Sequence, residues 1–252
     1  MDEVVLYQYP GDDELASLSP PCLKVHLGLR RLNLPYRAVD LRTPGQVRAK
    51  SRTGRVPVLE TRAGRICDSV AILDAAEELA GHPLGPDDRA GRAQDRVWEY
   101  FANDSLYGVV VFLRWCVPDH ARGFVRRALA DAPLWVRLAA GAFLPGSVRR
   151  RLTAQGLALR GADAIERELS RMLEAIEDGL AGGPFLGGRP EPGRGDLAVA
   201  SLIAQVGWGG AMPEPASRLE SRPAVVAHAA RTFEACRTPV PSWLAPPTAS
   251  EA

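Results

Sequence analysis

The first 80 residues alternate between strand-like and helix-like patterns, and this order constrains the fold more than any other feature of the sequence. Apolar or alternating runs typical of strands separate runs whose apolar residues have the spacing of a helix. In chain order, the patterns predict a strand over 4–9, a helix over 19–33, a strand over 35–41, a helix over 44–52, strands over 56–61 and 65–68, and a helix over 69–80. The resulting order, βαβαββα, predicts an α/β domain with one hairpin.

The remainder of the chain has a helical pattern. A Gly- and Pro-rich stretch, 81–88, is the predicted linker between an α/β domain over 1–80 and an all-helical domain over 89–238. The Pro-, Ala- and Ser-rich tail, 239–252, is expected to be disordered. The expected helices cover 89–116, shorter pieces of 119–160 broken around Pro133 and Pro145, 163–181, and the almost uniformly apolar 195–206, which should be buried.

Composition excludes several classes of partner. The net charge of the 252 residues is +1, so we expect no general attraction to nucleic acid. No run of about 18 uncharged apolar residues predicts a membrane span, and the acidic start lacks a signal-peptide pattern. The four cysteines form no C-x-x-C, and the four histidines lack metal-ligand spacing. We therefore expect a cytoplasmic protein with reduced thiols and no metal.

Three short stretches carry the chemistry. "SPPC" (19–22) opens the first helix, "SRTGRVPVLE" (51–60) carries a Val-Pro before a strand, and "DSVAIL" (68–73) opens another helix. Ser19 is a preferred N-cap residue, and proline is tolerated in the first turn that follows. A helix N-terminus favours anions, so both helix starts are candidate binding positions.

In this order, these stretches resemble the thioredoxin-like N-terminal domain of the glutathione transferase superfamily. "GGPFLGGRPEPGRGDLAVASLIA" (182–204) is similar to the C-terminal pattern of that superfamily, and "PGSVRRRLTAQGLALRGADAIERELSRML" (145–173) resembles its metaxin and failed-axon-connections branch. The resemblance covers roughly residues 3 to 235. It implies an α/β thioredoxin-like N-terminal domain followed by an all-α C-terminal domain.

The resemblance also implies a binding site for glutathione as co-substrate. In the family the bond corresponding to Val56–Pro57 is cis, so that the Val56 backbone can pair with an extended peptide. Asp68 and Ser69 correspond to the pair that holds the γ-glutamyl group, with Ser69 taking its α-carboxylate; Ser69 can also cap its helix. Arg55, or alternatively Lys50, would meet the glycyl carboxylate.

Ser19 corresponds to the residue that meets the glutathione sulfur, and it is the predicted catalytic residue. A hydroxyl donor at a helix N-terminus favours thiolate, which is the nucleophilic form. Tyr7 and Tyr9 are rival donors, and Ser17 is a lesser one. Cys22 lies one helical step inside and has no C-x-x-C partner, so we expect a core-packed thiol there, although a thiol-transfer role stays open.

The leading hypothesis is a homodimeric transferase that activates glutathione for attack on a small electrophilic or hydrophobic substrate. Glutathione-dependent isomerase or lyase chemistry needs the same thiolate, and a non-catalytic binding or assembly protein with the same fold is the main rival. Membrane-surface attachment through 133–151, which is apolar and then basic, is a third possibility. The second substrate would lie near the aromatic residues of the 98–115 helix: Trp98, Tyr100, Phe101, Tyr107 and Trp115.

The family pattern has one departure. The buried C-terminal helix of these proteins usually opens with a Ser or Thr N-cap and an Asp three residues later, which form a reciprocal capping box. Here Gly193 occupies the cap position, and Asp196 is kept. Glycine is an acceptable N-cap, so the helix is still expected, but the motif is incomplete.

Overall fold

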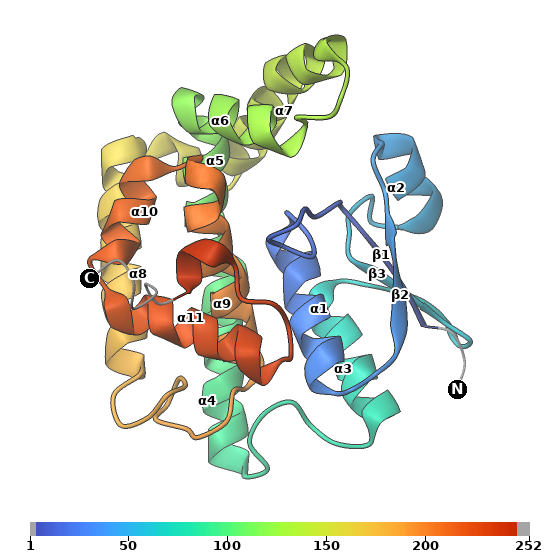
Figure 1. Ribbon diagram of the computed structural model, residues 1–252, viewed down its shortest axis with the longest axis vertical. Helices are drawn as coiled ribbons and strands as arrows, with labels where there is room; N and C mark the ends of the chain where they lie inside the picture. The colour runs from blue at the N-terminus through green and yellow to red at the C-terminus, as the bar shows by residue number, and fades with distance from the viewer. Residues whose placement is uncertain (1–3, 246–252) are drawn as a thin grey trace.

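A four-stranded sheet of order β2-β1-β3-β4 forms the N-terminal domain of the computed structural model, which describes residues 4–245 (Figure 1). β1 pairs in parallel with β2, whereas β1–β3 and β3–β4 are antiparallel. The elements are β1 (Val4–Gln8), α1 (Pro20–Arg31), β2 (Tyr36–Asp40), α2 (Pro44–Lys50), β3 (Val58–Thr61), β4 (Gly64–Cys67) and α3 (Ser69–Ala80). This order confirms the predicted βαβαββα domain.

An all-helical domain follows, and its centre is α9 (Arg194–Gly207), in which residues 194–206 are all buried. α9 packs against α4, α1 and α11, so it touches both domains. The other helices are α4 (Arg89–Tyr100), α5 (Tyr107–Cys116), α6 (Pro118–Ala128), α7 (Leu134–Ala154), α8 (Ala162–Gly179), α10 (Pro213–Glu220) and α11 (Pro223–Ala235). The burial of α9 and the all-helical second domain are as predicted.

One hydrophobic core joins the two domains. Buried side chains of α1, such as Leu23 and Leu27, belong to the same apolar cluster as Ala198 and Val199 of α9. Apolar burial of this kind stabilises by roughly 25 cal/mol per Å² of surface removed from water. α1 and α3 lie between the sheet and the helical domain (Figure 1), so the start of each helix has a fixed position relative to that domain.

The helix predicted over 89–116 is continuous, but its middle is a π-helical turn, Phe101–Leu106, between α4 and α5. A π turn inserts an extra residue into the helix and shifts the direction of the side chains beyond it. Such turns often occur at functional sites. The turn presents Ala102, Asn103 and Asp104 to the cavity described below.

The predicted helix break at Pro145 is wrong. α6 and α7 are separated at Pro133, as expected, but Pro145 lies inside α7. A proline there removes the hydrogen bond to the carbonyl four residues earlier, which belongs to Gly141. Gly141 is exposed, so water can donate to this carbonyl, and the helix continues past the proline.

The expectation of a disordered tail is wrong for residues 239–245. The Ser242 N–H and hydroxyl both donate to the Glu14 carboxylate, at 3.0 and 2.6 Å. Leu244 is buried, and the Trp243 indole donates to the carbonyl of Ala204. These contacts hold the segment against both domains. The remainder of the predicted tail, 246–252, lies outside the described residues.

Candidate functional site

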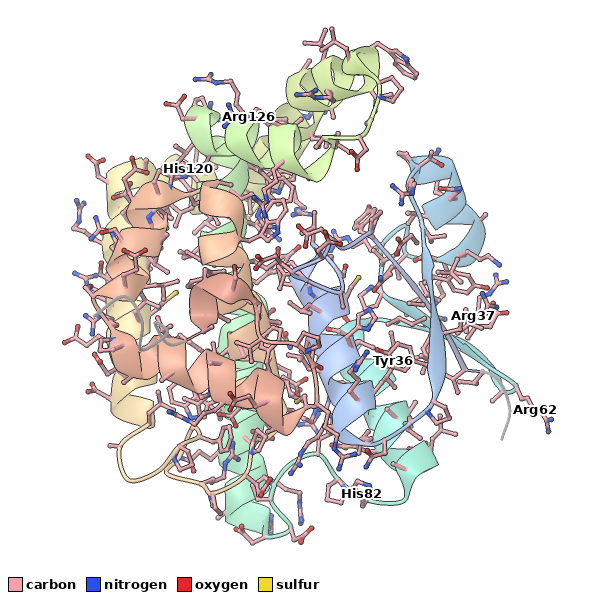
Figure 2. All side chains as sticks on the ribbon, viewed as in Figure 1. Tyr36, Arg37, Arg62, His82, His120 and Arg126 are labelled. Carbon is pink, nitrogen blue, oxygen red and sulfur yellow. The ribbon has the colours of Figure 1, made fainter. Side chains whose placement is uncertain are left out.

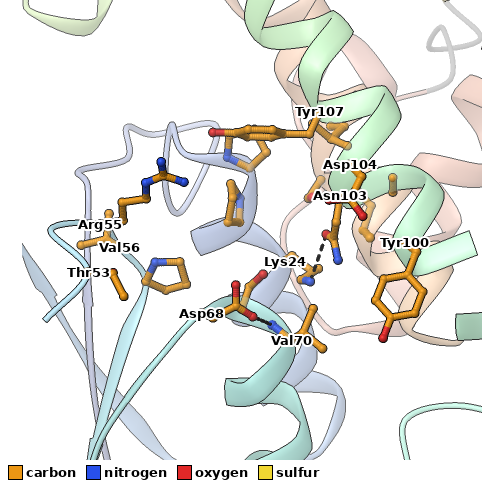
Figure 3. Close-up of a pocket in the computed structure, with 18 residues that line it drawn as sticks. Lys24, Thr53, Arg55, Val56, Asp68, Val70, Tyr100, Asn103, Asp104 and Tyr107 are labelled. Atoms are coloured by element: carbon orange, nitrogen blue, oxygen red, sulfur yellow. Dashed lines mark hydrogen bonds between the residues drawn. The ribbon is translucent and has the colours of Figure 1, made fainter. Parts of the chain in front are cut away.

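A cavity of about 680 Å³ lies between the two domains (Figure 3). The α/β domain contributes the start of α1, the segment before β3 and the start of α3, and the helical domain contributes the π turn and α9. The lining residues are Pro20, Pro21, Lys24, Thr53, Arg55, Val56, Pro57, Asp68, Ser69, Val70, Tyr100, Ala102, Asn103, Asp104, Tyr107, Ala198, Ser201 and Leu202.

Five of the six residues predicted for the site line this one cavity: Arg55, Val56, Pro57, Asp68 and Ser69. The Val56–Pro57 peptide bond is cis, as expected. The sixth residue, Ser19, is not among the lining residues, although the two prolines after it are. Between the alternatives Arg55 and Lys50, only Arg55 lines the cavity. Lys50 instead donates to the Tyr7 hydroxyl at 3.0 Å.

Asp68, not Ser69, caps α3, which corrects the predicted cap. One Asp68 carboxylate oxygen accepts the N–H of Val70 at 2.8 Å and that of Ala71 at 3.4 Å. Asp68 has a φ of 88°, a conformation that costs a residue other than glycine about 1–3 kcal/mol and is often found at functional sites. Ser69 is the first helical residue, and within the described part of the chain its hydroxyl makes no hydrogen bond.

Ser19 stands at the N-cap of α1, as predicted, but its side chain makes no capping hydrogen bond. Pro20 and Pro21 have no N–H to offer, and the Ser19 N–H donates to the Ser17 hydroxyl at 3.2 Å. Cys22 is fully buried, which raises the pKa of its thiol to about 11. The Ser19 hydroxyl opposes that shift by hydrogen bonding. Cys22 is therefore a protonated core thiol, in agreement with the expectation.

Neither of the two rival tyrosines of the N-terminal segment lines the cavity. The ring of Tyr7 lies under Lys50, whose Nζ is 4.4 Å from the ring centroid. Tyr9 is 44% exposed, and burial of its hydroxyl end raises its pKa. Tyr100 and Tyr107 do line the cavity, from the helical side (Figure 3). Of the aromatic residues considered for a second substrate, only these two reach it.

Lys24 is a site residue that the sequence reasoning missed. Its side chain is 1% exposed, and Nζ lies 3.2 Å from both Glu99 Oε1 and Asn103 Oδ1. Figure 3 shows the contact with Asn103. Burial lowers the pKa of Lys24, and the charge of Glu99 opposes the shift. The available signal was that Lys24, one of only two lysines, lies between the apolar residues Leu23 and Val25 of a helix.

Arg194 extends this ion pair into a network between the domains. Its guanidinium contacts Glu99 at 3.0 Å and Asp74 at 2.5 Å, and it donates to the carbonyl of Val70 at 3.0 Å. Glu99 comes from α4, Asp74 and Val70 from α3, and Lys24 from α1. The network therefore ties the start of α3, which carries Ser69, to the helical wall of the cavity. Across residues 4–245 no cluster of side chains is arranged to hold a metal ion.

Comparison with known proteins agrees with this architecture. Residues 16–84 match the family model for the N-terminal domain of glutathione S-transferase. Failed axon connections from Drosophila melanogaster is 26% identical over 265 residues, which cover 96% of this chain and 59% of that protein. This chain thus spans about three fifths of the length of that curated relative.

Two solved structures show the same fold. Glutathione transferase F2 from Populus trichocarpa superposes with a TM-score of 0.64 at 16% identity, over 93% of this chain and 95% of the other. A possible glutathione S-transferase from Rhodopseudomonas palustris gives 0.57 at 22% identity, over 92% and 94%. Residues 16–84 therefore match the N-terminal domain of glutathione S-transferase, the chain has the fold of these solved structures, and it is similar to failed axon connections over nearly its whole length.

Proposed function

We propose that the protein binds glutathione in the cavity between its domains and uses the thiol of glutathione as a nucleophile. The observation that carries the proposal is the meeting of Arg55, Val56–Pro57 and Asp68–Ser69 on one cavity of about 680 Å³. The γ-glutamyl carboxylate would bind the free Ser69 hydroxyl at the start of α3, where the helix dipole favours an anion. The peptide would run along Val56, with its glycyl carboxylate toward Arg55.

The glutathione sulfur would then lie at the start of α1, next to Ser19. Its thiolate would attack an electrophilic carbon of the second substrate. With an aryl halide the C–S bond forms, the halide departs with its electron pair, and the thiol proton goes to solvent. With an epoxide or an enal the C–S bond forms as the ring C–O bond or the C=C π bond breaks, and the product takes up a proton. Tyr100 and Tyr107 face this position from the helical side and would contact the small electrophilic or hydrophobic substrate. Isomerisation or thiolytic cleavage would use the same thiolate.

A second candidate function is binding of glutathione without catalysis. It is favoured by the poor supply of donors at the start of α1. Pro20 and Pro21 carry no N–H, and the N–H of Ser19 is engaged by Ser17. A helix start with few free N–H groups stabilises a thiolate less than a complete one does. The Ser19 hydroxyl is thus the group on which catalysis depends in the first proposal.

The test has two stages. Titration calorimetry with glutathione and with S-methylglutathione measures binding, and conjugation assays with aryl halides, epoxides and enals measure reaction. Binding of both ligands with turnover of at least one electrophile supports the transferase, and binding without turnover supports the second candidate. The absence of a heat of binding at millimolar glutathione would contradict both candidate functions.

A cytoplasmic homodimer is part of the same proposal, and light scattering on the purified protein tests the dimer.

A further inference from the structure

α7 is a 21-residue helix in which almost every residue is at least partly exposed to solvent. Of its residues, all of which the structure describes, Leu152 alone is buried. Ten large apolar side chains are exposed among the described residues, and half of them lie on this helix. They are Leu134, Trp135, Leu138, Phe143 and Leu144, exposed at 65, 72, 65, 76 and 42%. A soluble surface rarely gathers this much apolar area without a partner.

The same region has a net positive charge. Residues 118–154, which hold α6 and α7, contain seven arginines and two aspartates, a net charge of +5 in a chain whose total is +1. Arg126 on α6 and Arg149 and Arg150 on α7 are exposed, and no ion pair is found for them within the described residues. Figure 2 shows Arg126 on the outer side of α6.

The positions of the apolar residues and the arginines limit the kinds of partner that this surface can bind. The apolar side chains precede Pro145, and Arg149–Arg151 follow it. Figure 1 shows the first turns of α7 projecting from the edge of the molecule beyond α6, with which α7 packs. A symmetric contact between two copies through this surface would bring together two regions of charge +5, which repel each other.

We propose that α6 and α7 dock on an anionic lipid surface. The five exposed apolar side chains of α7 would enter the boundary between headgroups and acyl chains, and Arg126, Arg149 and Arg150 would contact lipid phosphates. The exposed apolar residues of α7 are not confined to one side of the helix, so its projecting first turns would enter the interface as an apolar tip, while long arginine side chains reach the phosphates. None of the described helices is long and apolar enough to cross the bilayer, so the contact would be at its surface. This proposal is independent of glutathione binding.

Flotation with vesicles tests the proposal on the full chain. The probe is a vesicle of phosphatidylcholine with 30 mol% phosphatidylserine, compared with pure phosphatidylcholine, at low and high salt. We expect binding to the anionic vesicles only, with a blue shift of tryptophan fluorescence from Trp135. Each exposed arginine contributes about fivefold in affinity, so the variant R126Q/R149Q/R150Q should bind on the order of 100-fold more weakly.

Two further variants make the result interpretable. W135S/F143S should lose the fluorescence shift and most of the binding, while R48Q/R89Q/R167Q, three exposed arginines elsewhere, should bind like the wild type. Circular dichroism confirms that each variant is folded. Equal binding to neutral vesicles, no vesicle binding, or an equal loss in R48Q/R89Q/R167Q would overturn the proposal. So would dimerisation that W135S/F143S abolishes in the absence of vesicle binding, because a second copy would then cover α7.

Discussion

Asp95 of α4 caps the N-terminus of α9, where Gly193 stands in the cap position. One Asp95 oxygen accepts the N–H of Arg194 at 2.9 Å, and the other accepts that of Gly195 at 3.0 Å. A Cβ added to Gly193 would collide with the Asp95 carboxylate. The second half of the expected box is kept, since Asp196 accepts the N–H of Gly193 at 2.8 Å. The cap that the sequence lacks locally is therefore supplied by another helix.

Asp95→Ala should destabilise the protein by about 3 kcal/mol. It removes the two caps of α9 and the partner that Asp95 provides for Arg189, at 2.9 Å, and it leaves these donors buried. Urea denaturation followed by circular dichroism measures the effect. Asp131→Ala, an exposed aspartate in the same domain, is the control and should change stability by less than about 0.5 kcal/mol. A similar small change in Asp95→Ala would show that its contacts are energetically unimportant.

Gly193→Ser should destabilise the wild type even though serine is the better N-cap. The φ of Gly193 is −107°, which any residue adopts, so the effect comes from crowding against Asp95 and is about 1–3 kcal/mol. In the Asp95→Ala background the new hydroxyl can cap α9 without crowding, and the same change should stabilise by roughly a few tenths of a kcal/mol. A double-mutant cycle in urea measures both. Equal effects in the two backgrounds would rule out the shared cap.

The cap of α9 shows which parts of the fold a local sequence pattern can predict and which it cannot. The strands, α1, α3, α8 and α9 follow from hydrophobic spacing and proline positions, because those signals act within a few residues. The incomplete box at Gly193 was also visible, but its compensation was not, because Asp95 lies almost 100 positions earlier and only packing brings it to α9. Pro145 was misinterpreted because the exposure of α7, which makes a proline tolerable there, is a tertiary property.

The candidate site also has residues that the sequence indicates and residues that only the tertiary structure reveals. Val56–Pro57 and Asp68–Ser69 could be named from the sequence because each is a short continuous stretch that resembles a motif of the glutathione transferase superfamily, and the structure places both on one cavity. Lys24 was missed because its importance depends on Glu99 and Asn103, which belong to the other domain. Ser19 was placed correctly at a helix start, but no sequence pattern says which way a hydroxyl beside two prolines turns.

Ser69→Ala should weaken glutathione binding by about 1–3 kcal/mol, roughly 5- to 150-fold in Kd, because the ligand carboxylate loses a hydrogen bond. Titration calorimetry measures it. Since Asp68 provides the cap of α3, the variant should keep the stability of the wild type, which separates a binding role from a folding role. Ser217→Ala, on the exposed side of α10, is the matched control. Unchanged affinity in Ser69→Ala would contradict the role proposed for this hydroxyl.

Stability should fall as the pH drops from about 6.5 to 4, and His26 should account for a large part of the loss. The His26 ring contacts the Tyr36 hydroxyl at 2.5 Å (Figure 2) and also contacts the Gln8 side chain. Burial lowers the pKa of His26 to about 4. An unfolded histidine has a pKa near 6.5, so between these values the unfolded state binds the extra proton and is favoured. The contribution is fully present above pH 6.5 and amounts to roughly 3 kcal/mol.

Urea denaturation at several pH values, on the wild type and on His26→Gln, tests this. The variant should be less stable at pH 7 but should show a shallower fall toward pH 4. His82→Gln replaces an exposed histidine and should keep the slope of the wild type. If His26→Gln and the wild type lose stability in parallel over this range, another group is responsible for the pH dependence.

Ser19→Ala should lower turnover at pH 7 by about tenfold or more and leave glutathione affinity nearly unchanged. The hydroxyl would donate at a helix start where Pro20 and Pro21 supply no N–H, so the thiolate would depend on it more than at a complete helix start. A charge-assisted hydrogen bond of about 1.5–3 kcal/mol corresponds to a lowering of the thiol pKa by roughly one to two units. The loss should shrink as the pH rises past the pKa of a free thiol, about 8.5, because the thiolate then forms without the hydroxyl.

Rate–pH profiles of Ser19→Ala, Tyr107→Phe and Cys22→Ala decide among the donors. Cys22→Ala removes a buried thiol with a raised pKa and should keep its activity. Wild-type rates in Ser19→Ala at every pH, with a loss in Tyr107→Phe, would transfer the role to Tyr107 across the cavity.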